Sequence, residues 1–240
     1  MRVANLHCRR EIGLIEGGYL EISARAVLFD MDGVLMSSLG SVERSWRSYA
    51  KARSLDPELA VKLAHGRRAI ETVQALRPDL DAKAELQIIE DLEVGDNEGI
   101  VVLPGVRKIL AELPPGSWGI VTSATERLAR SRLAYAGIAI PKYFVTADMV
   151  ANGKPHPEPY RTGAAMLGAP VEQSIVIEDA PAGVASGKAA GCRVLAVLTT
   201  HPADTLTSAD WRVATLEDVQ IVTGTDGSFG LRMHLWQPPV

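Results

Sequence analysis

Short apolar segments bounded by turn residues recur along the chain and predict buried β-strands. They are rich in Val, Ile and Leu, and they show no alternation of apolar and polar positions. A continuous apolar run of this kind is typical of a strand that is covered on both faces. The segments are AVLFD (26–30), WGIVTS (118–123), KYFVTA (142–147), SIVIED (174–179) and CRVLAVL (192–198).

Segments with helical periodicity separate these strands, and two of them end at a glycine. Gly137 and Gly191 stand where the left-handed residue that follows a helix is expected. Because strands that alternate with helices of this length indicate a parallel sheet, we predict an α/β fold with a Rossmann-like parallel sheet core. The helical segments are 106–113, 126–137, 159–169 and 181–191.

One long stretch of the chain contains no strand pattern. Residues 41–98 show only amphipathic patterns of helical period, of which VERSWRSYAKAR (42–53) is an example. We therefore predict an inserted α-helical cap domain over residues 39–103, which divides the core into segments 24–38 and 104–215. Helical inserts of this kind are natural lids over a site at the edge of a sheet.

The residues outside this core form two terminal extensions, 1–23 and 216–240. The first has charges throughout and lacks the continuous apolar stretch of a secretory signal, so it is either an extra strand or a disordered leader. In the second, two apolar runs flank TGTDGSFG (223–230), which predicts a hairpin. The two extensions could pair with each other, cover a sheet edge or form an interface.

The composition is that of an ordinary globular protein, with 240 residues, 47% hydrophobic and 22% charged. A net charge of −4 lacks the basic excess that is typical of nucleic-acid binding. A nucleic-acid partner is therefore not expected. No apolar run reaches the ~20 residues that span a bilayer, so a membrane is not expected as a partner either. Cys8 and Cys192 indicate neither a disulfide framework nor a metal cluster, and a cytoplasmic monomer or weak dimer is expected.

Polar residues that could take part in catalysis or ligand binding follow four of the predicted strands. The carboxyl ends of parallel strands meet at one edge of the sheet, where ligands of open α/β folds bind. Two aspartates one residue apart after an apolar strand raise each other's pKa unless a cation lies between them. The residues are Asp30 with Asp32, Thr122 with Ser123, Asp148 with Lys154, and Glu178 with Asp179.

Several carboxylates at one edge of the sheet need a counter-charge, and a hard divalent cation is the simplest. Mg²⁺ binds through one or two carboxylates together with water and a substrate phosphate, and the chain has no His/Cys set with zinc-like spacing. The hydroxyls, backbone N–H groups and Lys154 suit the peripheral oxygens of a phosphate, whereas Asp148 is expected to be a turn residue. The strand ends therefore predict a phosphoryl-transfer site with Mg²⁺ as its cofactor.

Four segments, in order, resemble the signature motifs of the haloacid dehalogenase superfamily. They are DMDGVL (30–35), VTS (121–123), GKPHPEPY (153–160) and VIEDAPAGVASGKAAGC (176–192). The likeness extends over roughly residues 24–215, and the helical insert resembles the small α-helical cap of the superfamily. Within the superfamily, the chain is most similar to β-phosphoglucomutases and to phosphatases of sugar and polyol phosphates, such as glycerol 3-phosphate and 2-deoxyglucose 6-phosphate.

The resemblance implies a role for each matching residue. Asp30 would be the nucleophile that attacks phosphorus and forms an aspartyl-phosphate, and Asp32 would protonate the leaving oxygen and later deprotonate water. Ser123, the Ala124 N–H group and Lys154 would stabilise charge on the transferring group. Dehalogenases of the superfamily lack the second aspartate, so its presence argues against dehalogenation.

The same resemblance implies a Mg²⁺ ion held by Asp30, the backbone carbonyl of Asp32 and Asp179. Glu178 would assist it directly or through water. Because the whole catalytic set is intact, a binding or regulatory protein on a fold that has lost catalysis is the less favoured alternative. Thr122 is expected to cap the helix that follows it.

Substrate specificity is expected in the helical insert, at LAHGRRAIETV (63–73). Caps that resemble β-phosphoglucomutase carry an arginine three residues after the glycine, where it grips a distal phosphate, and in this chain the position is Ala69. The HGRR arrangement is more similar to the phosphatases, so Arg68 and His65 are predicted to face the substrate while Arg67 is solvated. The chain is thus expected to be a phosphoric monoester hydrolase acting on a small phosphorylated metabolite, with a phosphosugar mutase as the alternative.

Overall fold

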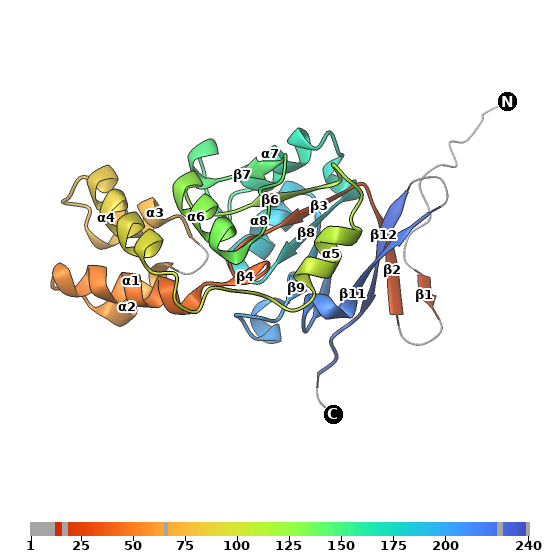
Figure 1. Cartoon of the computed structure of the whole chain (residues 1–240), viewed down its shortest axis with the longest axis horizontal. Coiled ribbons are helices and arrows are strands. Elements are labelled where there is room, and N and C mark those ends of the chain that lie inside the picture. The colour runs from red at the N-terminus through yellow and green to blue at the C-terminus, as the bar shows by residue number, and fades with distance from the viewer. Residues whose placement is uncertain (1–12, 16–18, 65–66, 225–227, 239–240) are drawn as a thin grey trace.

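A computed structural model describes residues 13–15, 19–64, 67–224 and 228–238 of the chain. Its centre is a six-stranded sheet with the order β10-β9-β8-β3-β6-β7, in which every neighbouring pair is parallel (Figure 1). The predicted parallel α/β class is confirmed. The strands are β3 (Ala26–Phe29), β6 (Trp118–Val121), β7 (Phe144–Val145), β8 (Ser174–Glu178), β9 (Arg193–Val197) and β10 (Trp211–Val213).

The middle strand, β3, is buried on both faces between β8 and β6. Val27 and Phe29 belong to one hydrophobic cluster, and Leu28 belongs to a second cluster on the other face. This two-sided burial explains why the strand has a continuous apolar sequence instead of an alternating one. β7 is shorter than predicted, since only two residues of the segment 142–147 form strand pairs.

Four helices cover the two faces of this sheet. α5 and α6 pack on the face that contains Phe29, and α7 and α8 pack on the face that contains Leu28. α6 and α8 end at Gly137 and Gly191, which adopt the predicted left-handed conformation with φ of 63° and 93°. The helices are α5 (Val106–Glu112), α6 (Glu126–Ala136), α7 (Glu158–Met166) and α8 (Pro181–Ala190).

Four further helices, α1 to α4, form a helical insert that projects from one end of the sheet (Figure 1). Trp46 and Tyr49 are buried in a hydrophobic cluster of the insert's own, with their rings edge to face. Two short antiparallel strands, not foreseen from the sequence, form the base of the insert: β4 (Met36–Ser37) and β5 (Val101–Val102). The insert helices are α1 (Leu39–Ala52), α2 (Pro57–Ala64), α3 (Ala69–Leu76) and α4 (Ala82–Gly95).

Within the described parts of the terminal extensions, four strands form a separate antiparallel sheet, ordered β1-β2-β12-β11, at the end opposite the helical insert (Figure 1). β12 pairs with both β11 and β2, so the structure shows the extensions pairing with each other. Leu20 and Met233 are buried in the same hydrophobic cluster as Phe29, whereas Glu21 and Arg232 form an ion pair of 2.9 Å. The strands are β1 (Gly13–Ile15), β2 (Tyr19–Ala24), β11 (Val219–Thr223) and β12 (Phe229–His234).

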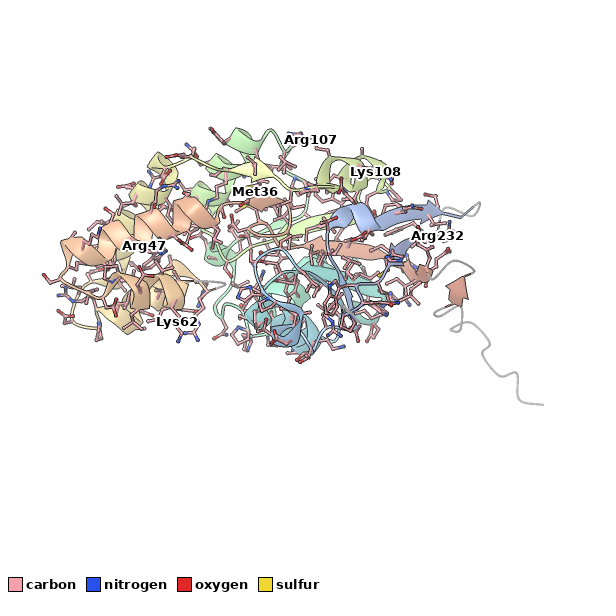
Figure 2. All side chains as sticks on the ribbon, turned by 90° about the horizontal axis from the view of Figure 1, so that it is seen from below. Met36, Arg47, Lys62, Arg107, Lys108 and Arg232 are labelled. Atoms are coloured by element: carbon pink, nitrogen blue, oxygen red, sulfur yellow. The ribbon has the colours of Figure 1, made fainter. Side chains whose placement is uncertain are left out.

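Basic side chains of the surface lie on well-separated elements. Figure 2 shows Arg47 and Lys62 on the helical insert, Arg107 and Lys108 on α5, and Arg232 on β12. In the described ranges, no helix combines the length and the apolar character that crossing a membrane requires.

Candidate active site

Of the eight polar residues predicted at the strand ends, all but Asp148 line one cavity of about 190 Å³, and Asp148 instead accepts a hydrogen bond from the Glu126 N–H group at 2.6 Å. β3 is flanked by β8 and β6, and the three strands run in the same direction, so their carboxyl ends open on the same side. The helical insert lines the other side of the cavity, with Trp46 and Leu86 among the lining residues. The predicted core residues that line the cavity are Asp30, Asp32, Ser123, Ala124, Lys154, Glu178 and Asp179.

Lys154 is the buried cation at the centre of the site, with only 3% of its side chain exposed. Its Nζ donates hydrogen bonds to Asp30 Oδ1 at 2.6 Å, to Glu178 Oε1 at 2.7 Å and to the Val121 carbonyl oxygen at 3.0 Å. Burial alone would lower the pKa of Lys154, but the Asp30 and Glu178 carboxylates raise it above its ordinary value. The ammonium group therefore stays charged and fixes the Asp30 carboxylate.

Glu178 is fully engaged by hydrogen-bond donors. Its Oε1 atom accepts from Lys154 and from the Tyr160 hydroxyl at 2.7 Å, and its Oε2 atom accepts from the N–H groups of Asp179 and Ala180 at 3.0 and 3.2 Å. Among the two roles considered for this residue, the arrangement favours an indirect contribution to a metal site. Its main effect in the described structure is to hold Lys154 in place.

Asp30, Glu178 and Asp179 form a cluster of carboxylates in which one oxygen of each lies within 4.8 Å of the others. Burial raises the pKa of Asp30 to about 7, although the Lys154 charge opposes the shift. Burial, together with Glu178 and Asp30, also raises the pKa of Asp179 well above its ordinary value. A single ammonium group therefore does not compensate the cluster, and hard oxygen ligands with excess negative charge suit a divalent cation.

The backbone at Gly33 lies close to the Asp179 carboxylate. Gly33 has a φ of +84°, and a Cβ atom at this position would lie 2.0 Å from Asp179 Oδ2. The Thr200 hydroxyl donates a hydrogen bond to the same Oδ2 atom. Thr200 was missed in the sequence analysis, although it follows the predicted strand 192–198 and the strand-end rule applies to it equally.

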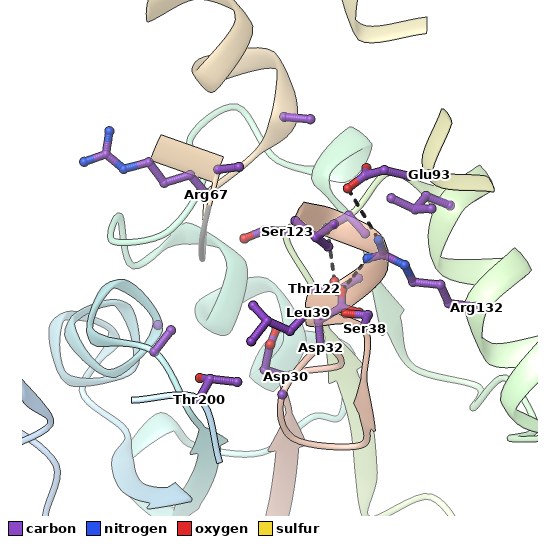
Figure 3. A pocket seen from close by; sticks show the side chains of 18 of the residues that line it. Asp30, Asp32, Ser38, Leu39, Arg67, Glu93, Thr122, Ser123, Arg132 and Thr200 are labelled. Carbon is purple, nitrogen blue, oxygen red and sulfur yellow. Dashed lines mark hydrogen bonds and ion pairs between the residues drawn. The ribbon is translucent and has the colours of Figure 1, made fainter. Parts of the chain in front are cut away.

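The Asp32 carboxylate points away from this cluster. Its Oδ1 atom accepts a hydrogen bond from the Ser38 hydroxyl at 2.6 Å, and its Oδ2 atom accepts one from Arg132 Nη1 at 2.9 Å (Figure 3). This geometry agrees with a division of labour in which only the backbone of Asp32 is near a metal site. Neither Ser38 nor Arg132 was identified from the sequence.

Comparisons with known proteins show to which protein family the chain belongs. The family model for haloacid dehalogenase-like hydrolases matches residues 24–191. The chain belongs to this family.

Two curated relatives and one solved structure illustrate the membership. The chain is 40% identical to hexitol phosphatase A of Escherichia coli (strain K12), over 85% of this chain and 96% of that protein. It is 36% identical to glycerol-1-phosphate phosphohydrolase 2 of Saccharomyces cerevisiae (strain ATCC 204508 / S288c), over 78% of this chain and 80% of that one. The predicted enzyme class, a phosphoric monoester hydrolase, is confirmed by these relatives. A crystal structure of β-phosphoglucomutase from Clostridium difficile has the same fold, with a TM-score of 0.70 at 20% identity, covering 82% of this chain and 93% of that one.

The loop at 122–125 of this haloacid dehalogenase-like hydrolase differs in part from the prediction. Ser123 Oγ is buried at the cavity and has no hydrogen-bond partner among the described residues, so it is available to a ligand. The Ala124 N–H group instead donates to Thr122 Oγ1 at 3.1 Å. The prediction that Thr122 caps α6 is wrong. The cap is Thr125, whose hydroxyl accepts a hydrogen bond from the Leu128 N–H group.

One arginine of the helical insert also differs from the prediction. Arg68 does not line the cavity, because its guanidinium donates to the Val150 and Ala151 carbonyl oxygens at 3.1 and 3.0 Å and so joins the insert to a core loop. Arg67 is exposed, in agreement with the expectation that it is solvated; it is also among the lining residues of the cavity, but its guanidinium extends away from Asp30 (Figure 3). His65 lies outside the described residues.

Proposed function

We propose that the protein is a Mg²⁺-dependent phosphatase that hydrolyses small sugar- or polyol-phosphate monoesters through an aspartyl-phosphate. The observation that carries the proposal is the fixed Asp30 carboxylate, which faces a cavity together with an unpartnered Ser123 hydroxyl. The two curated relatives act on phosphate esters of polyols, as their names state, and they support this class of substrate.

In the first step, an Asp30 oxygen attacks phosphorus, and the bond from phosphorus to the ester oxygen breaks. Asp32 gives its proton to the departing oxygen, which leaves as an alcohol. In the second step, Asp32 takes a proton from water as the water oxygen attacks the phosphorus of the aspartyl-phosphate, and Asp30 is released. Lys154 and Ser123 would donate to the phosphoryl oxygens as charge develops on them.

Mg²⁺ fits the residues that the site offers. Asp30, Asp179 and the backbone carbonyl of Asp32 would hold it, and Glu178 would act through water. When bound, the ion supplies positive charge that stabilises the transferring phosphoryl group. The carboxylate cluster supports this assignment, since burial and then the neighbouring carboxylates raise the pKa values of Asp30 and Asp179, and the Lys154 charge opposes these shifts without cancelling them.

The mutase alternative would require a site for a second phosphate in the helical insert. The part of the cavity that the insert lines has Ala69 at the position of the distal-phosphate arginine, and it contains Glu90 and Glu93. Arg127 and Arg132 already pair with these two carboxylates, so the residue at position 69, alanine instead of arginine, is the observation that disfavours a second phosphate. We therefore place the phosphatase ahead of the mutase; the predicted cytoplasmic location and the monomer or weak dimer stay predictions.

The deciding experiment measures phosphate release in Mg²⁺ over a panel of hexitol, glycerol, sugar and glycolytic phosphates. Asp30→Asn serves as the blank. Release that disappears in the variant supports the proposal and ranks the substrates. Conversion of β-glucose 1-phosphate to glucose 6-phosphate with a bisphosphate primer, without free phosphate, would establish the mutase instead.

A further inference from the structure

Arg132 is a buried arginine whose guanidinium lies between two carboxylates beside the cavity (Figure 3). Only 3% of its side chain is exposed. Nη1 donates to Asp32 Oδ2 at 2.9 Å, and Nη2 donates to Glu93 Oε1 at 3.4 Å. Asp32 belongs to the core, whereas Glu93 belongs to α4 of the helical insert, so one guanidinium joins both parts of the molecule.

The position of Arg132 on α6 is unusual for a charged side chain. It follows Leu128 by four residues and precedes Leu133, so it lies on the buried face of the helix, where an apolar residue packs more readily. A guanidinium taken out of water needs partners for its charge. Asp32 and Glu93 are these partners, and both line the cavity, so the burial of Arg132 depends on residues of the site.

We infer that Arg132 is a positioning residue that fixes the direction of the Asp32 carboxylate, and that Glu93 fixes Arg132 in turn. The inference rests on the proposed function, because it assigns a purpose to the orientation of the acid–base residue. Arg132 itself does not touch the substrate.

Two donors, Ser38 and Arg132, are needed to fix the orientation of the Asp32 carboxylate, because Ser38 alone leaves it free to rotate. A carboxylate held at Oδ1 by one hydroxyl can still turn about its last torsion, because that torsion is broad. A second contact at Oδ2 stops the rotation. Since a guanidinium only donates, Oδ2 stays an acceptor. The Ser38 hydroxyl at Oδ1 can both donate and accept, so Oδ1 is the oxygen that can carry the proton for the leaving group.

Glu93 makes this arrangement depend on the helical insert. It is 6% exposed and reaches Arg132 from α4, so the guanidinium has both partners only when α4 lies against α6. The structure thus links the docking of the insert to the alignment of Asp32.

A purely structural tie between α4 and α6 is the competing explanation, and the chain supplies a matched control for it. Arg127 lies on the same helix and donates to Glu90 at 2.8 Å and to Asp91 at 2.6 Å, both on α4. Within the described ranges, its hydrogen bonds do not include Asp32. A role limited to helix docking would therefore give Arg127 and Arg132 variants the same kinetic pattern.

The experiment compares kcat/KM for an alkyl ester, glycerol 3-phosphate, with kcat/KM for an aryl ester, p-nitrophenyl phosphate. This constant reports the steps up to departure of the leaving group, whereas kcat also includes hydrolysis of the aspartyl-phosphate, in which Asp32 acts on both esters alike. A nitrophenolate leaves without a proton, whereas an alcohol needs one. We expect Arg132→Gln to lower kcat/KM for the alkyl ester roughly 10²-fold, the cost of misplacing a catalytic group by ~1 Å, with a much smaller change for the aryl ester. Arg132→Lys should restore part of the loss, and Arg127→Gln should leave the ratio of the two kcat/KM values unchanged.

Two further variants keep the inference testable if Arg132→Gln does not fold. Glu93→Gln retains the Arg132–Asp32 pair and should give a smaller loss that is again selective for the alkyl ester. In an Asp32→Ala background, adding Arg132→Gln should cause no further loss, because the group through which it acts is gone.

The results separate this inference from the proposed function. Equal losses for both esters in Arg132→Gln or in Glu93→Gln, or losses that add to that of Asp32→Ala, would overturn the positioning role alone. A wild-type protein that releases no phosphate from either ester in Mg²⁺ would overturn the proposed function and this inference with it.

Discussion

The two halves of the cavity are held in different ways. In the core half, Asp30, Lys154 and Glu178 are buried and joined by contacts of 2.6 and 2.7 Å. In the half that the helical insert lines, apolar side chains such as Trp46 predominate, and the charged groups bind across to the core, as Glu93 does. The core half is therefore preorganised by its own sheet, while the insert half depends on how α4 and α3 dock.

The comparison assigns different tasks to the two halves. Groups that act on phosphorus need fixed positions, because electrostatic stabilisation is effective only when donors are in place before the reaction. Groups that select the rest of the substrate can belong to an element that moves, since closure over the site also excludes water. Variants in the core half should therefore lower kcat most, and variants in the insert half should act mainly on KM, except at Glu93, which acts on Asp32 through Arg132.

The largest effect is expected from Asp30→Asn. The amide keeps the shape of the carboxylate but is not a nucleophile, so kcat should fall roughly 10⁴–10⁶-fold, as when a covalent nucleophile is removed. Phosphate release from glycerol 3-phosphate measures the loss. Equilibrium binding of inorganic phosphate, followed by calorimetry, should persist in the variant. A residual kcat above about one per cent of wild type would contradict the nucleophilic role, because the asparagine amide cannot form the aspartyl-phosphate.

Removal of the buried cation should affect both rate and stability. Lys154→Met leaves Asp30 and Glu178 without their shared donor, and breaking a buried ion pair costs ~3–5 kcal/mol of unfolding free energy. kcat should fall roughly 10²–10³-fold with the loss of one preorganised donor. Urea unfolding and steady-state kinetics measure the two effects. Lys188→Met is the matched control, because this lysine pairs with Asp210 at the surface, and its loss should change the unfolding free energy by less than ~1 kcal/mol.

Mg²⁺ should stabilise the folded protein more at pH 8 than at pH 5.5. Burial raises the pKa of Asp30 to about 7, so between pH 4 and 7 the metal-free folded state binds a proton that the unfolded state does not. Its stability therefore declines as the pH rises through about 7. Mg²⁺ binds the ionised carboxylates and offsets this decline, with ~2.7 kcal/mol expected at a hundredfold excess over Kd. Thermal unfolding with Mg²⁺ or with EDTA at both pH values measures the difference. An equal Tm increase at both pH values, or one that survives in Asp179→Asn, would place the ion elsewhere.

The core half could be predicted from the sequence because topology forces it together. Parallel strands bring their carboxyl ends to one edge, so Asp30, Lys154 and Glu178 had to be neighbours once the strands were identified. The same rule applied to β9 would have found Thr200, which donates to Asp179. Arg132 could not be found in this way, since its helical position predicted only burial and gave no sign of a partner 100 residues away.

The insert half was predicted less well because local sequence does not determine which way a long side chain turns. Arg67 and Arg68 are adjacent, and the likeness to the phosphatases favoured Arg68 as the substrate-facing residue. In the structure, two carbonyl oxygens of the loop at 150–151 bind Arg68, and Glu71 accepts from its Nε at 2.7 Å. These partners come from a tertiary contact that the motif does not encode.

The smallest effect is expected from Arg68→Ala, and it tests the insert half directly. Because Arg68 joins α3 to the loop that precedes Lys154, its loss should weaken docking of the insert and raise KM roughly three- to tenfold, the equivalent of about one net hydrogen bond. The increase should be similar for hexitol, glycerol and aryl phosphates, with kcat nearly unchanged. Arg67→Ala is the matched neighbour, which shares the sequence context but lacks these carbonyl contacts. If Arg68→Ala instead changes the ranking of the esters, the residue contacts the substrate after all, and its assignment to docking is wrong. If Arg67→Ala raises KM for the hexitol phosphate alone, the specificity of the insert belongs to Arg67.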